Sequence, residues 1–300
     1  MKKKTYLFAL MAMVLTLGSC SDNENGIGGE TSKYITVSTS IGNMTRVATD
    51  EKGGQTFEEG DEISVYAWTG DATVAPETRE RVVNNAINKL TNGSWISTPQ
   101  MLWKNNRDKH YFIGVYPISA ISDLSAGEYT FDETKQVESD LLVAVNKDGL
   151  SYNVDEQQTV PLTFTHVMAK LAVNLTYKNQ WGGIPTVEKV VVGNAAKEAT
   201  INYLTKVVTP STTAKEDFSL PEITENTKYV SVIIPQEDVK QLTIVIGGKN
   251  FVYDNGTPFK LESGKITTVN LEVGRDEIKL GDVKITNWED GSTFSGEALN

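Results

Sequence analysis

The sequence predicts an all-β protein built from two tandem β-sandwiches. From Lys33 onward, short runs rich in Val, Ile, Thr and aromatic residues are separated by turn residues, and no long helical pattern stands out. Regular spacing of short strands favours sandwiches over alternating strands and helices. The length of 300 residues is natural for two domains, which we place at residues 33–156 and 157–300.

The first twenty residues read as an export signal and are set aside from the fold. Three lysines precede the apolar run "YLFALMAMVLTLG", which is too short to span a bilayer comfortably as a permanent helix. The run ends in "LGSC", which resembles the lipobox of bacterial lipoproteins and predicts that Cys20, the only cysteine, is lipidated and anchors the chain to the outer membrane. The alternative is an ordinary secretory signal with an incidental cysteine.

Residues 21–32 are predicted to form a flexible tether, because they are rich in Gly, Asn and acidic residues and contain almost nothing to bury. The acidic run beside Cys20 is also similar to a surface-export signal of lipoproteins. The whole chain carries 28 basic and 39 acidic residues, a formal net charge of −11. Such a surface repels nucleic acid and anionic headgroups, which excludes both as partners.

In the first domain the strands are expected at "YITVSTSI", "DEISVYAW", "HYFIGVYP" and "DLLVAV". The second of these places Ile63, Val65 and Ala67 on one face, with Tyr66 and Trp68 on the other. Residues 77–90 fit a helix or a strand, and we favour a strand because of the β-branched pair and the asparagines.

The second domain begins with an unusual strand, "VPLTFTHVMAKLAVNL", in which the apolar phase changes near Met168. A β-bulge, or a chain that leaves one sheet for another, would produce this change. Later strands are expected at "KVVVGN", "KYVSVIIP", "QLTIVIGGKNFVYDNG", "KITTVNLEVG" and "DVKITNW".

No constellation of residues indicates catalysis, so we expect neither an enzyme nor a cofactor. The chain has two histidines. His110 is expected at the surface, and His166 in the core with a backbone partner. Neither has a neighbouring set of zinc ligands. Acidic turns near glycine lack the ligand order of a calcium-binding EF-hand loop, although weak calcium binding stays open. Paired carboxylates such as Asp155 and Glu156 read as solvated turns.

Taken together, several segments resemble the fimbrillin family of pilus subunits and pilus-associated lipoproteins. They are the lipobox at Cys20, "TR" before "TFEEGDEISVYAW", "MLWKNNRDKHYFIGVYP", "SDLLVAV" leading into "VPLTFTHVMAKLAVNL", and "LESGKITTVNLEVGRDEIKLGDVKITNWEDGS". The resemblance implies two transthyretin-like β-sandwiches, export to the outer membrane as a lipoprotein, and assembly with other pilus subunits by strand exchange in a fimbrium.

The resemblance also implies proteolytic removal of the first strand after an arginine. Arg46, followed by Val47, matches that position, and Arg79 and Arg81 are other possible cleavage sites. The donor strand would be the C-terminal segment 281–300, unless that segment completes its own domain. Stalk, tip and anchor roles stay open, as does adhesion to a host or bacterial glycan or protein.

A second hypothesis is an outer-surface glycan-binding lipoprotein. Exposed tryptophans can stack on sugar rings. Trp95 and Trp103 are the candidates for such stacking, since Trp68 and Trp288 lie in strand contexts that favour burial.

Overall fold

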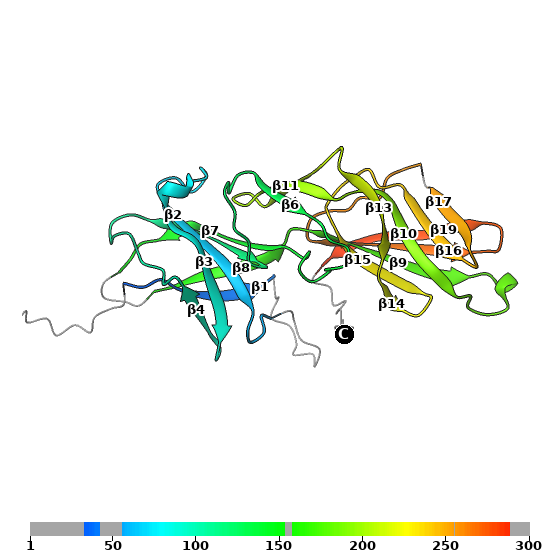
Figure 1. Ribbon diagram of the computed structural model, residues 1–300, viewed down its shortest axis with the longest axis horizontal. Helices are drawn as coiled ribbons and strands as arrows, with labels where there is room; N and C mark the ends of the chain where they lie inside the picture. The colour runs from blue at the N-terminus through cyan, green and yellow to red at the C-terminus, as the bar shows by residue number, and fades with distance from the viewer. Residues whose placement is uncertain (1–32, 43–55, 154–157, 255, 289–300) are drawn as a thin grey trace, which may run out of the picture.

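The computed structural model describes residues 33–42, 56–153, 158–254 and 256–288. Within these ranges the regular structure is β-strand apart from two short 3₁₀ turns, Thr78–Glu80 and Asn179–Trp181, which confirms the all-β prediction. The described part is elongated, with strands β1 to β8 mostly at one end and β9 to β19 at the other (Figure 1). That each half is a transthyretin-like sandwich stays a prediction.

The first half is a seven-stranded sheet in the order β1-β8-β7-β5-β2-β3-β4. Its strands are β1 (Thr36–Ile41), β8 (Thr159–His166), β7 (Leu142–Leu150), β5 (His110–Tyr116), β2 (Glu62–Thr69), β3 (Arg81–Thr91) and β4 (Ser94–Thr98). Every neighbouring pair is antiparallel except β1 and β8, which run parallel.

Both faces of strand β2 are apolar and buried, so the sheet packs against other elements on each side. Ile63, Val65 and Ala67 belong to a core enclosed by the curled sheet, which we call the inner core. Tyr66 and Trp68, on the opposite face, belong to the larger core that continues into the second half. The predicted alternation is therefore confirmed, and each of its faces packs into a different core.

The second half has two main sheets that share the larger core. One has the order β14-β15-β9-β18-β19, and its strands are β14 (Glu222–Thr224), β15 (Lys228–Ile233), β9 (Ala169–Tyr177), β18 (Lys265–Val273) and β19 (Ile278–Asn287). The other has the order β13-β10-β16-β17, with strands β13 (Lys215–Leu220), β10 (Val187–Ala196), β16 (Gln241–Ile246) and β17 (Lys249–Asp254).

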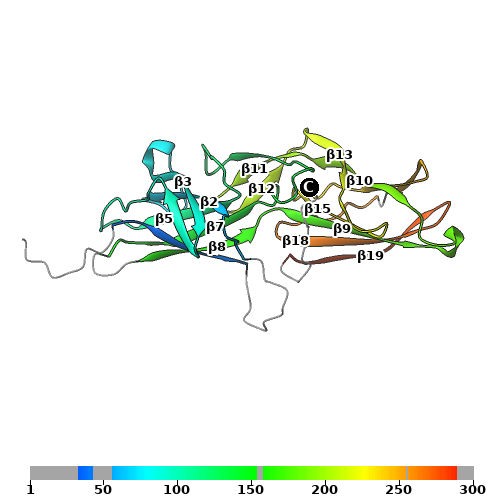
Figure 2. The ribbon, with the colours of Figure 1, turned by 60° about the horizontal axis from the view of Figure 1, so that its bottom comes forward.

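A small third sheet ties the halves together. Strand β6 (Gly127–Thr130) comes from the first half of the sequence and pairs with β11 (Glu198–Asn202), which also pairs with β12 (Val207–Pro210). This sheet lies between the two ends of the molecule in both ribbon views (Figures 1 and 2). The larger core is continuous across it.

The segment 77–90 is strand β3 after the 3₁₀ turn, so the strand interpretation is confirmed and the helix alternative is wrong. The burial alternates along Arg81, Val83, Ala86 and Asn88, with a shift of register against β2. Asn85 has a φ of 56°, which an asparagine tolerates better than a β-branched residue.

The chain changes sheets at Val167 and Met168. Strand β8 ends at His166 in the first sheet, and β9 begins at Ala169 in the second. The predicted change of apolar phase near Met168 is thus a chain leaving one sheet for another. The domain boundary expected between residues 156 and 157 precedes β8, whereas β8 pairs within the first sheet, so the crossing between sheets falls later than that boundary.

A buried polar cluster lies at this crossing. The ring of Trp288, directly after β19, stacks on His166 with centroids 4.2 Å apart and planes 8° from parallel. Lys170 Nζ lies 4.1 Å from the Trp288 ring centroid. His166 Nδ1 lies 2.8 Å from Asp140 Oδ1. The cluster joins the ends of β8 and β19 to the start of β9, and so fixes the two sheets against each other.

Lys170 makes the stability of this junction depend on pH. Burial, only partly opposed by Asp140, lowers the pKa of Lys170 to about 8. The unfolded chain keeps an ordinary lysine pKa, so between pH 8 and 10 the unfolded state binds more protons and stability rises with pH. We expect Lys170→Met to remove this rise. In urea unfolding, the stability of the wild type relative to the variant should increase by about 1–3 kcal/mol from pH 8 to pH 10.

The exposed Lys189 provides the control, because Lys189→Met should leave the pH dependence of the wild type in place. Parallel pH profiles for wild type and Lys170→Met would contradict the assignment.

Candidate functional site: the groove along β1

Strand β1 closes the curled first sheet. It pairs with β8 along its whole length, with Val37 opposite Val160 and Ile41 opposite Phe164. Just before β1, the backbone also bonds to a segment other than β8, because Ile35 N donates a hydrogen bond to Met101 O at 2.9 Å. Residues 35–41 therefore connect strand β8 with the segment that follows β4, although the two are distant in sequence.

Two inward-facing side chains anchor this strand. Ile35 is 3% exposed and Val37 is 6% exposed, and both belong to the inner core. Burying an aliphatic side chain of this size contributes about 1.5–3 kcal/mol. On the outer face, Thr36 contacts Thr159 and Ser40 donates to Thr163 through exposed hydroxyls. Exposed contacts of this kind add little, so the ladder and the two buried side chains supply most of the attachment.

A groove separates β1 from β4, the other edge of the sheet, and has a volume of about 1220 Å³. One side-chain hydrogen bond crosses it, from Trp95 Nε1 on β4 to Thr39 Oγ1 on β1 at 3.0 Å. The lining residues are Thr36–Gly42, Thr56, Phe57, Leu90, Gly93–Ile96, Thr159 and Thr163. None of these lining residues is ionisable, so the groove suits a neutral backbone and offers no acid or base.

Phe57 lines the groove and makes aromatic contacts that the sequence did not reveal. Its ring lies edge-on to Trp95, Tyr116 and Phe164, at centroid distances of 5.3, 5.4 and 5.1 Å. Burial, with a further contribution from Asp61, raises the pKa of Tyr116 to about 12, so this tyrosine stays neutral. The motif "TFEEGD" does not single out Phe57 by its spacing, because the partners of this ring are distant in sequence.

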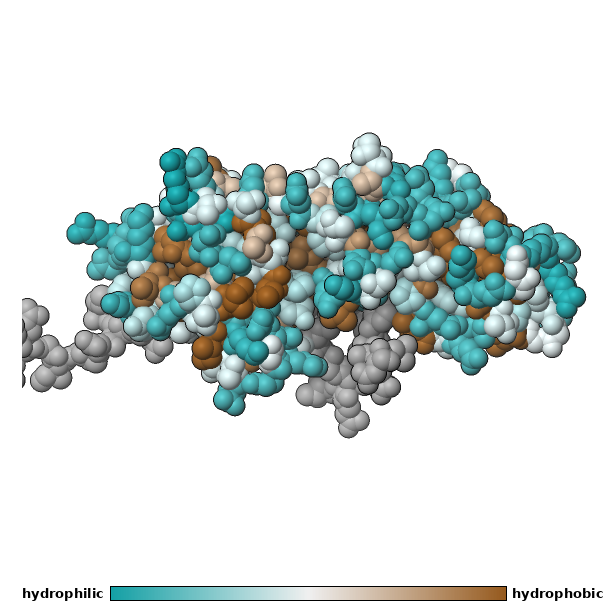
Figure 3. Space-filling view, viewed as in Figure 1, coloured by the Kyte–Doolittle hydropathy of each residue, from teal (hydrophilic) through white to brown (hydrophobic). Residues whose placement is uncertain are grey.

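The face that carries β3 and β4 shows hydrophobic side chains at its surface (Figure 3). Ile96, on β4, is 55% exposed and lines the groove. An exposed apolar residue on an edge strand is typical of a site for strand pairing.

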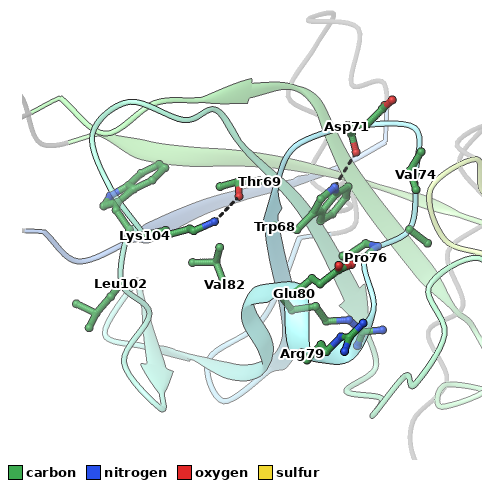
Figure 4. A pocket seen from close by; sticks show the side chains of 13 residues that line it. Trp68, Thr69, Asp71, Val74, Pro76, Arg79, Glu80, Val82, Leu102 and Lys104 are labelled. Atoms are coloured by element: carbon green, nitrogen blue, oxygen red, sulfur yellow. Dashed lines mark hydrogen bonds between the residues drawn. The ribbon is translucent and has the colours of Figure 1, made fainter.

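A second hollow, of about 760 Å³, lies beside β2 and the 3₁₀ turn. Its lining mixes cations, anions and apolar groups, and two of its polar groups are already engaged (Figure 4). Trp68 Nε1 donates to Asp71 O, and Lys104 Nζ donates to Thr69 Oγ1. This hollow offers no coherent recognition chemistry.

The predicted lipidation and processing residues, Cys20, Arg46 and Val47, lie outside the described residues. The alternative cleavage sites differ sharply. Arg79 is exposed in the 3₁₀ turn and pairs with Glu77. Arg81 is buried, and its guanidinium donates to Ile121 O and Ser122 O at 2.6 Å. Because proteases need an exposed, extensible segment, Arg81 does not suit cleavage.

The two tryptophans proposed for sugar stacking are both engaged within the protein. Trp103 is 8% exposed, stacks on Tyr152 and meets Phe112 edge-on, so the expectation of an accessible ring is corrected. It packs inward because its segment follows β4 back into the inner core. Trp95 is half-buried, with its indole nitrogen bonded to Thr39. These positions give the glycan hypothesis no support.

The histidines also differ from expectation. His110, predicted at the surface, is 0% exposed. Its Nε2 accepts from Lys104 N at 3.0 Å, and burial lowers its pKa, so it is a neutral structural residue. His166 is buried as predicted, and its Nδ1 lies 2.8 Å from Asp140 Oδ1, a side-chain partner that the sequence did not reveal.

The described ranges contain no group of three or more His, Cys, Asp or Glu side chains placed to hold a metal ion. No helix in those ranges has the length and apolar character that a membrane span requires.

Comparison with known proteins identifies the family. The sequence model described as fimbrillin-like matches residues 45–288. The chain belongs to the fimbrillin-like family. A candidate fimbrium subunit of Bacteroides uniformis, Fim1C, is 25% identical over 317 residues, which covers 97% of each chain. The family is fimbrial and not enzymatic in character.

Solved structures share the fold of this fimbrillin-like protein. The crystal structure of a candidate cell adhesion protein from Bacteroides uniformis superposes with a TM-score of 0.60 at 18% identity, covering 86% of this chain and 100% of that one. A candidate cell adhesion protein from Bacteroides ovatus gives 0.61 at 18% identity, covering 85% and 98%.

We expect Val37→Ala to loosen β1 without unfolding the sheet. The substitution removes buried methyl groups and should cost about 1–2 kcal/mol of local stability. In hydrogen exchange, amide protection across residues 36–41 should fall by roughly 5- to 30-fold, since each 1.4 kcal/mol is tenfold. The exposed neighbour Ser38→Ala is the matched control. Equal losses of protection in both variants would contradict the anchoring role of Val37.

Proposed function

We propose that this protein is a surface-exposed pilus component that assembles by β-strand exchange. It would reach the outer membrane as a lipoprotein through Cys20. Cleavage after Arg46 would then detach the segment that contains β1, and a strand of another pilus subunit would take its place. Membership of the fimbrillin-like family supports the pilus role, and the family match begins at residue 45, beside the proposed cleavage site.

The position of β1 is the observation that carries the proposal. β1 lies at the edge of its sheet and pairs with β8 along its whole length. Its inward side chains belong to the inner core. Loss of the strand would leave an unpaired edge on β8 beside exposed apolar surface. Such a site binds extended segments through backbone hydrogen bonds and alternate side-chain pockets.

The geometry of such an exchange predicts filaments. The acceptor groove and the donor segment are different surfaces of the subunit, so the contact is head-to-tail and does not close on itself. Parallel pairing of the incoming strand with β8 would repeat the pairing that β1 makes in the uncut chain.

The C-terminal segment has a place in its own subunit. Strand β19 pairs with β18 as the edge of the five-stranded sheet, and Trp288 is buried in the junction cluster. Residues 289–300 lie outside the described residues. β19 nevertheless presents Val283 and Ile285 at its surface, 40% and 39% exposed, which is the apolar alternation that a donor strand requires.

We expect digestion with an arginine-specific protease to release residues 21–46 and to trigger assembly. The cut turns β1 into a separate molecule that can be replaced. Intact mass spectrometry would follow the cut, and light scattering would follow the assembly. Arg46→Ala should block both, whereas Arg79→Ala, at the exposed second site, should block neither.

A chain that stays monomeric after a clean cut at Arg46 would refute the polymerising role. The N-terminal residue of protein recovered from cells separates the remaining roles. Lipidated Cys20 indicates an anchor or a precursor, and Val47 indicates a processed stalk or tip subunit.

A further inference from the structure

Thr39 is the polar residue on the otherwise apolar, inward-facing side of β1 and the residue before it. Because side chains alternate along a strand, Ile35, Val37, Thr39 and Ile41 share one face. Three of these residues are apolar, and the fourth carries a hydroxyl. That hydroxyl accepts a hydrogen bond from Trp95 Nε1 at 3.0 Å across the groove.

Trp95 is set in place independently of β1. It lies on β4, where it pairs with Leu90 of β3, and its ring meets Phe57 edge-on. Both Trp95 and Phe57 follow Arg46 in the sequence, so cleavage there leaves them on the acceptor subunit. Once β1 has left, the groove includes the site of β1, and its remaining lining residues, those outside 36–42, are also uncharged. The indole N–H would then face this site without its acceptor.

We propose that Trp95 makes the groove selective for its occupant at the position of Thr39. The preferred occupant is an extended segment of another pilus subunit with the pattern apolar, any, apolar, any, hydrogen-bond acceptor, any, apolar. Ile35, Val37, Thr39 and Ile41 are the template for this pattern. The inference rests on the proposed strand exchange and names the partner segment that the groove accepts.

The cost of an unpaired indole N–H favours an occupant with a hydrogen-bond acceptor at the position of Thr39 over one with an apolar residue there. A half-buried indole N–H that loses its acceptor keeps a desolvation cost that a new apolar contact does not remove. The outer-face hydroxyl of Ser40 also makes a hydrogen bond, to Thr163, but the pair is exposed and water can replace either partner. Ser40 is therefore a matched control for Thr39: both hydroxyls make a hydrogen bond, but only that of Thr39 is expected to affect binding.

The test is a double-mutant cycle on the chain cut at Arg46. Fluorescent peptides of residues 33–42 are titrated against the cut wild-type protein and cut Trp95→Phe, with affinity read by fluorescence anisotropy. Thr39→Val in the peptide should weaken binding to the wild-type protein about fivefold more than binding to Trp95→Phe. Ser40→Ala in the peptide should change affinity less than about twofold for both proteins.

A Thr39→Val effect of equal size on both proteins would overturn the selectivity. Failure of the wild-type peptide to bind would instead refute the strand exchange. In that case the same cycle is measured in the uncut chain, as hydrogen-exchange protection of residues 36–41 in Trp95→Phe, Thr39→Val and the double variant. Additive losses of protection there would overturn the role of Trp95, and coupled losses would support it.

Discussion

The parallel pairing of β1 with β8 is the interaction on which the proposed assembly depends. The two strands are far apart in sequence, and residues 43–55 link β1 to the rest of the chain. While that link is intact, β1 competes for its site at the high effective concentration of an intramolecular segment. Cutting the link would leave the ladder between β1 and β8 in place, but it would convert the strand into a ligand that dilution can remove.

The sheet that would receive a new strand is held from its other face. Tyr66 and Trp68 pack into the larger core. The Arg81 guanidinium donates hydrogen bonds to the carbonyls of residues 121 and 122 and so holds that segment on this face. Strand β6 then continues from this covering segment into a sheet with β11. Because these contacts do not involve β1, its departure would leave the acceptor sheet supported.

The groove differs in kind from a catalytic cleft. Its lining is apolar or hydroxylic, whereas the polar cluster of His166, Lys170 and Asp140 lies at the crossing between sheets, packed on Trp288. Buried titratable groups of this sort rigidify a junction when they are satisfied. In the proposed assembly, recognition and rigidity therefore belong to separate parts of the molecule. Strand β8 connects them, because its edge pairs with β1 and its last residue, His166, stacks on Trp288.

Local patterns in the sequence determined much of the fold. The alternation of Ile63, Val65 and Ala67 against Tyr66 and Trp68 predicted a strand with two distinct faces. The phase change near Met168 predicted either a β-bulge or a move between sheets, and the structure shows the move. These features depend on the two-residue period of a strand, which a sequence displays directly. Only the tertiary structure decided which segments close the groove, that Trp103 and His110 are buried, and that Trp95 bonds Thr39. Those contacts join residues distant in the chain, and their geometry depends on how the sheet curls, which local pattern does not encode.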